Sequence, residues 1–109
     1  MAFIIKALGA GTLTVSGTAD LYTVPAGKSA VINNVRLVNG NSTATSAMNL
    51  YVQPSGATDV RIYNKDFTIS SSLSMVIPDV VTLGQGDKLR LAIGAAQNIG
   101  YMVNGAERG

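Results

Sequence analysis

Short runs in which apolar and polar residues alternate recur about every ten residues along this chain, separated by turn-forming residues. A β-strand points successive side chains to opposite faces, so this period of two predicts extended segments with one buried face. About eight or nine such segments are expected, and no window shows the period of an amphipathic helix. The pattern predicts an all-β fold, namely an antiparallel β-sandwich or jelly roll of about eight strands.

The stretch Leu21–Asn39 organises the rest of the chain, because it reads as a strand, a tight turn and a long strand. Pro25 fixes its own φ for the first corner of the turn, and Gly27 can take the positive φ that a type II turn needs. β-branched residues dominate Ala30–Val38, which favours a strand. The polar pair Asn33–Asn34 interrupts the apolar alternation, so we expect a β-bulge that switches the buried face.

Three segments are expected along the chain. Residues 1–11 form an apolar N-terminal arm or first strand, residues 12–104 the β-sandwich domain, and residues 105–109 a polar tail that frays. Because Ala2–Leu8 is apolar on both faces, something must cover it. Two alternatives stay open for this segment: a strand buried in the chain's own core, or an arm that lies on a neighbouring subunit.

The apolar faces of the expected strands define a core. A chain of 109 residues, of which 47% are hydrophobic, can bury such a core without a metal or a disulfide. The alternation assigns to this core Leu13, Val15, Val35, Leu37, Met48, Leu50, Val52, Val60, Ile62, Met75, Ile77, Leu89, Leu91, Ile93, Ile99 and Val103.

Composition argues against several classes of function. The absence of His removes the usual general base near neutral pH, and the absence of Cys excludes disulfides and thiolate metal sites. The eight basic residues are spread singly and the net charge is only +2, so we expect solubilising charges on strand faces and no nucleic-acid partner. No apolar run approaches the roughly 20 residues of a membrane span, so no membrane partner is expected.

The polar residues form no recognisable catalytic or metal-binding motif. No Ser lies in a Gly-x-Ser-x-Gly sequence, no Asp-x-Asp run suggests calcium, and the four tyrosines are scattered. Gly84–Asp87 is expected to be a tight turn, because no helical pattern follows it as a phosphate-binding loop would need. We therefore expect no enzyme activity, no cofactor and no metal. The carboxylates are expected in or beside turns or the tail: Asp20, Asp59, Asp66, Asp79, Asp87 and Glu107.

Four stretches resemble small structural proteins of tailed bacteriophages. In such proteins a Tyr-Thr-Val-Pro-Ala-Gly-Lys hairpin and a late Leu-x-x-Gly-Asp turn recur on a β-sandwich. Within this group, the chain length and the apolar N-terminal segment look most like a head decoration, or cement, protein, although tail-tube, tail-tip and head-completion proteins share similar sandwiches. The stretches are Leu21-Tyr-Thr-Val-Pro-Ala-Gly-Lys28, Val35-Arg-Leu-Val-Asn39, Leu50-Tyr-Val52 and Val81-Thr-Leu-Gly-Gln-Gly-Asp-Lys88.

The resemblance, which covers Leu21–Val103, implies a non-enzymatic virion structural protein. It would be made in the host cytoplasm, assemble as a homotrimer, bind the major capsid protein on the outer capsid surface and bridge capsid subunits. The residues expected at a subunit or capsid interface are Phe3, Ile4, Ile5 and Leu8. One alternative is a phage tail or receptor-contact module that binds host-surface glycan, and another is a hydrolase whose site the sequence does not reveal.

Overall fold

The computed structural model describes residues 3–78, 81–95 and 97–109, with side chains from residue 7 onward. Within these ranges nine strands form two antiparallel sheets, which confirms the predicted all-β sandwich. Val80, the first residue of an expected strand, and the carboxylate Asp79 lie outside the described residues. The strands are β1 (Phe3–Leu13), β2 (Gly17–Thr23), β3 (Ser29–Asn39), β4 (Met48–Gln53), β5 (Val60–Arg61), β6 (Ser74–Ile77), β7 (Val81–Leu83), β8 (Lys88–Ile93) and β9 (Ile99–Arg108).

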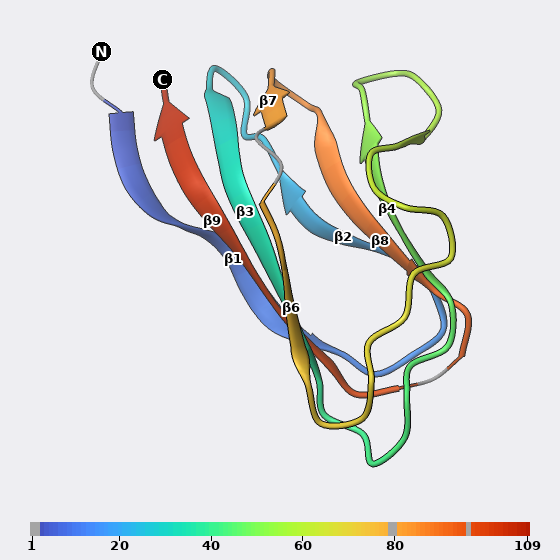
Figure 1. Cartoon of the computed structure of the whole chain (residues 1–109). Coiled ribbons are helices and arrows are strands. Elements are labelled where there is room, and N and C mark those ends of the chain that lie inside the picture. The colour runs from blue at the N-terminus through green and yellow to red at the C-terminus, as the bar shows by residue number, and fades with distance from the viewer. Residues whose placement is uncertain (1–2, 79–80, 96) are drawn as a thin grey trace.

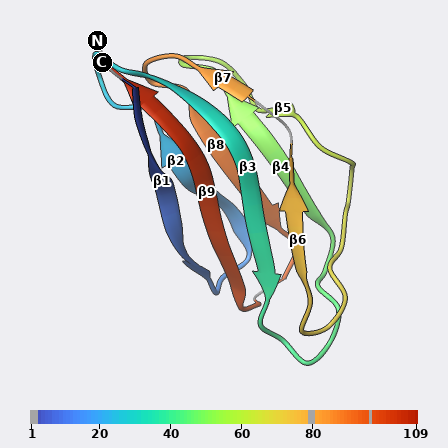
Figure 2. The same ribbon diagram turned by 60° about the vertical axis from the view of Figure 1, so that its left-hand side comes forward.

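The two sheets pack face to face and enclose the core between them. Sheet 1 has the order β1-β9-β3-β6, with β7 also paired to β3, and sheet 2 has the order β2-β8-β4-β5. In Figure 2 the strands of sheet 1 cross in front, and β2, β8 and β4 lie behind them. Each sheet therefore has one inward face and one outward face.

The strand pairings are nested along the chain. β1 pairs with β9, β2 with β8, β3 with both β6 and β7, and β4 with β5. The chain thus folds as one long hairpin whose two arms roll into two sheets, which is a jelly-roll arrangement. The two chain ends consequently lie at the same end of the sandwich (Figure 1).

The β2–β3 turn follows the prediction at one residue and departs from it at another. Gly27 has a positive φ of 78°, as expected for the second corner. The Lys28 amide donates to the Pro25 carbonyl at 3.2 Å, so Ala26, and not Pro25, occupies the first corner. The turn starts one residue later than predicted because Val24 is still paired with the opposite segment, where its amide donates to Asp87 O at 3.0 Å.

The predicted bulge in the long strand is confirmed. The pairing of β3 with β9 shifts register between Ile32 and Asn34. Before the shift the buried residues are Ala30 and Ile32, and after it they are Val35 and Leu37. One extra residue thus moves the apolar face of a single strand from even to odd positions, and the strand stays against the core along its whole length.

The observed core contains most of the predicted residues, but the prediction was wrong for Val15 and Val60. Val15 is 73% exposed in the turn after β1, and Val60 is 53% exposed in β5, a two-residue strand at the edge of sheet 2. Leu13, Val52, Ile62 and Met75 are partly buried and pack against the core. Among the described residues, the alternation missed eight buried hydrophobic side chains: Leu21, Tyr22, Val24, Ala30, Ile32, Phe67, Ile69 and Leu83.

The C-terminal residues are not a frayed tail, which corrects the prediction for residues 105–109. β9 continues to Arg108 and lies between β1 and β3, so its backbone pairs on both sides. Gly105 and Glu107 are buried. The polar composition was misleading because two long strands, distant in sequence, flank this segment.

Candidate interaction surface

The predicted interface residues lie in the first strand of sheet 1. Phe3, Ile4 and Ile5 pair with Arg108, Glu107 and Ala106 of β9, so the segment is a strand of the chain's own sheet. Leu8 is partly buried and packs against the core, whereas the side chains of the other three lie outside the described set. Among the described strands β1 pairs with β9 alone, so its other backbone edge forms no strand pairing within this part of the chain. A contact between these residues and a neighbouring subunit remains a prediction.

A close approach of the two sheets fixes the position of β1. A Cβ atom at Gly9 would overlap the carbonyl oxygen of Leu21 in β2, so only glycine fits there. The register of β1 against β9 also shifts between Ala7 and Gly9. This glycine therefore lets the edge strand of sheet 1 lie directly on the edge strand of sheet 2.

A buried polar cluster joins the sheets near the chain ends. The Tyr22 hydroxyl donates to Glu107 Oε2 at 2.5 Å, and Lys28 Nζ lies 3.8 Å from Glu107 Oε1. The Glu107 side chain is only 5% exposed. Burial, together with the hydrogen bond to Glu107, raises the pKa of Tyr22 well above its ordinary value. Such a paired acid is a structural element, because its charge is already satisfied inside the protein.

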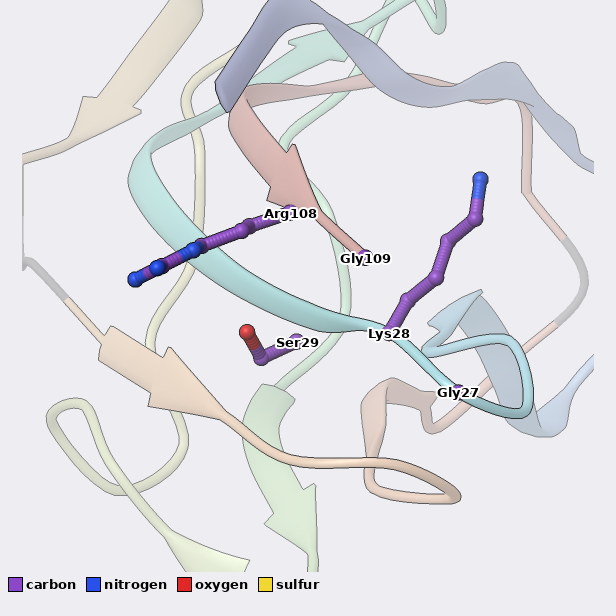
Figure 3. A pocket seen from close by; sticks show the side chains of 5 residues that line it. All are labelled: Gly27, Lys28, Ser29, Arg108 and Gly109. Carbon is purple, nitrogen blue, oxygen red and sulfur yellow. The ribbon is translucent and has the colours of Figure 1, made fainter. Parts of the chain in front are cut away.

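A hollow of about 380 Å³ lies beside this cluster, lined by Gly27, Lys28, Ser29, Arg108 and Gly109 (Figure 3). Two cationic side chains at one hollow suggest an anion site, but their directions argue against it. Figure 3 shows the Lys28 and Arg108 side chains extending away from each other. Lys28 is directed to Glu107, so the hollow presents no pair of converging cations.

A second hollow, of about 350 Å³, lies on the outward face of sheet 1. It is lined mainly by apolar and small residues of β1, β3 and β9, and Arg36 is its only charged lining residue. Gly100 leaves part of its floor without a side chain, because a Cβ atom there would lie 3.7 Å from the Cβ of Val38 on this face. Arg36 is one of the eight basic residues that were expected to act only as solubilising charges on strand faces. The sequence offered one indication that Arg36 differs from the other basic residues, namely its position within a strand rich in β-branched residues.

The described residues hold no group of three or more His, Cys, Asp or Glu side chains that could bind a metal. Two carboxylates differ from the predicted positions in turns or the tail: Asp20 lies within β2, and Glu107 lies within β9. Asp20 accepts from Arg90 Nε at 2.8 Å and Asp87 accepts from the Gly84 amide at 2.8 Å, so both act as structural acceptors. No helix in the described part of the chain is long and apolar enough to cross a membrane.

The tyrosines do not form a common platform for a sugar. Tyr22 is buried against Glu107, and Tyr63 packs edge-on against Phe67 with ring centroids 5.2 Å apart. Tyr51 lies under the Arg61 guanidinium, 5.6 Å from the ring centroid to Cζ. No observation therefore favours the glycan-binding alternative.

Comparison with known proteins identifies the architecture. No family model matches the sequence, and a search of curated proteins finds no significant match. Among solved structures, a chain of the infectious bursal disease virus Gx strain matches with a TM-score of 0.52 and 9% identity, over 97% of this chain and 32% of that one. A chain of the VP2 subviral particle of that virus matches with a TM-score of 0.52 and 13% identity, over 97% of this chain and 31% of that one. The shared feature is the fold.

These structural neighbours are chains from a virus and from its VP2 subviral particle. A chain of the Gt strain gives the same coverage, with a TM-score of 0.51 and 8% identity. The present chain spans about a third of the length of each. Because they are not tailed-phage decoration proteins, the likeness to that group depends on the sequence motifs alone.

Proposed function

We propose that this chain is a non-enzymatic structural protein of a virion, and specifically a decoration protein on the outer capsid surface. The observation that carries the proposal is a jelly roll that matches virion chains over 97% of its length. The motifs resembling tailed-phage proteins support the more specific assignment, since the turn at Gly27 and the late turn at Gly84–Asp87 both occur in the structure. Fold likeness alone would not distinguish a shell-forming from a shell-binding protein.

The physical demands of a decoration protein match what the chain offers. Such a protein binds a shell, bridges neighbouring subunits and performs no reaction. A compact sandwich that forms a homotrimer presents three copies of one weak patch to a symmetric lattice, and avidity then supplies the strength. In this proposal the partners are the major capsid protein and other copies of the chain, and the open edge of β1 contributes to the contact between copies.

Co-sedimentation tests the proposal. Purified chain is added to gradient-purified capsids from a strain that lacks its gene, and the pellet is assayed for the chain. We expect saturable binding at a fixed ratio to the capsid protein, and light scattering of the free chain should give the mass of a trimer. A chain that stays in the supernatant at all concentrations overturns the decoration role, and a monomer mass overturns the trimer.

A further inference from the structure

The outward face of sheet 2 is polar and satisfies its own charges. Arg90 donates through Nε to Asp20 Oδ1 at 2.8 Å and through Nη1 to Asp59 at 3.3 Å. Lys88 Nζ lies 3.4 Å from Asp20, and Arg61 donates to Asn49 at 3.2 Å. A face whose charged groups already have partners and contact water gains little from docking.

The outward face of sheet 1 has the opposite character. Strand register places Ala10, Met102, Arg36 and Val76 side by side in one row across β1, β9, β3 and β6. The adjacent row contains Val38, which is 41% exposed, while Met102 and Val76 are 41% and 49% exposed. Three of the six large hydrophobic side chains that the described residues expose thus gather here, beside the hollow at Gly11 and Gly100.

The charge of this face is also one-sided. Glu107 is the only acidic residue within the five strands of sheet 1, and it is buried against Tyr22. The exposed Arg36 guanidinium makes no hydrogen bond or ion pair with any described residue. An arginine without an acceptor, surrounded by apolar side chains, is a recurrent centre of protein interfaces, because a partner carboxylate can bind it in bidentate geometry.

We propose that the outward face of sheet 1 docks onto a different protein, whose surface presents an apolar side chain to the hollow and a carboxylate to Arg36. Charge complementarity selects this occupant. A second copy placed face to face would bring Arg36 against a sheet whose strands offer no exposed carboxylate among the described residues. This inference rests on the proposed function and deepens it, because the partner would then be the capsid protein, with sheet 2 facing the solvent.

Two matched pairs of variants test the assignment in the co-sedimentation assay. Arg36→Glu has its control in Arg61→Glu, because both residues are exposed arginines on strands of opposite sheets. Val38→Asp has its control in Val60→Asp, because the two valines are 41% and 53% exposed. We expect both sheet 1 variants to bind about tenfold more weakly or worse, and both sheet 2 variants to bind within about twofold of the unmodified chain. Circular dichroism and thermal melting establish that each variant is folded, and Val38→Ser replaces Val38→Asp if the latter is not.

The outcomes distinguish failure of the docking face from failure of the proposed decoration role. If the unmodified chain does not sediment with capsids, both the docking face and the decoration role are wrong. If it sediments and the sheet 1 variants bind equally well, the docking face is wrong and the decoration role stands. Equal losses in all four variants reveal a general charge effect and also overturn the assignment. A change of oligomeric mass in Arg36→Glu makes a second copy the occupant and overturns the choice of a different protein.

Discussion

Tyr22 and Glu107 lie 85 residues apart in sequence and are joined by a hydrogen bond of 2.5 Å that links sheet 2 to sheet 1. The hydroxyl donates to a buried carboxylate near the end of the sandwich where the chain ends meet. The pair thus ties together two strands that occupy different layers. Its contribution can be measured without altering either outward face.

Removing the Tyr22 hydroxyl should destabilise the fold. In Tyr22→Phe the buried Glu107 carboxylate loses a donor, and we expect the free energy of unfolding to fall by about 1.5–3 kcal/mol. Tyr51→Phe is the control, because no described residue is hydrogen-bonded to the Tyr51 hydroxyl, and it should change stability by less than about 0.5 kcal/mol. Urea denaturation followed by circular dichroism measures both. Equal stability of the two variants would contradict a structural role for the pair.

Alkaline pH should act on the same pair. Burial and the hydrogen bond to Glu107 raise the pKa of Tyr22 in the folded chain, whereas in the unfolded chain it ionises near its usual pKa of about 10. Above that pH the unfolded state releases a proton that the folded state keeps, so stability falls by up to about 1.4 kcal/mol per pH unit. Below it this contribution is fully present. The slope of stability against pH above 10 should be smaller in Tyr22→Phe, and identical slopes would refute the assignment.

Gly105 should tolerate no side chain. It lies in β9 between two strands, and a Cβ atom there would overlap the carbonyl oxygen of Val31. We expect Gly105→Ala to cost about 3 kcal/mol or more, because the obstacle is backbone and not a movable side chain. At Gly100, in the same strand, an added Cβ would meet only Val38 at 3.7 Å, so Gly100→Ala should change stability by about 1 kcal/mol or less. Thermal unfolding of the two variants decides the point, and similar midpoints would contradict it.

Substitution of Asn39 by Asp should destabilise the fold more than substitution by Ala. Its buried amide nitrogen donates to the carbonyls of Thr43, Ile69 and Ser70 at 2.8, 3.1 and 3.1 Å, and so holds two loops to the end of β3. Asn39→Ala should cost about 2–3 kcal/mol. Asn39→Asp keeps the shape of the side chain but places a carboxylate against three carbonyl oxygens, so it should lower the free energy of unfolding further. Part of the lost stability should return in acid, because the protonated carboxyl group is neutral and can donate a hydrogen bond.

The control for this substitution is Asn33→Asp. Asn33 is exposed beside the bulge, so the same chemical change should alter stability by less than about 0.5 kcal/mol. Denaturation at neutral and at acidic pH gives the required values. If Asn39→Asp lowers the free energy of unfolding less than Asn39→Ala does, the hydrogen bonds donated by Asn39 are not what holds the loops.

Local alternation predicted those parts of the fold that depend on local rules. The strand Lys88–Ile93 has Leu89, Leu91 and Ile93 buried, as its period of two requires. The bulge in β3 was also predictable, because Asn33–Asn34 breaks the apolar pattern. In both places the signal lies within a few residues of the feature.

Features that depend on distant strands were not predictable in this way. Val15 and Val60 look like core residues, yet nothing covers a turn or the two-residue edge strand β5. Glu107 looks like part of a polar tail, yet it is buried because β1 and β3 flank β9. The candidate docking face has the same origin, since Arg36, Val76 and Met102 become neighbours only through the register of three strands.

The nested pairing has a kinetic consequence. Among the described strands β1 pairs with β9 alone, so β1 is synthesised long before the strand that gives it a neighbour. Contacts this far apart in sequence slow folding, since the chain must close a large loop before any of them forms. During synthesis the apolar Phe3–Leu8 stretch would lack its sheet, and this interval is when the nascent polypeptide is most exposed to aggregation and most in need of a chaperone.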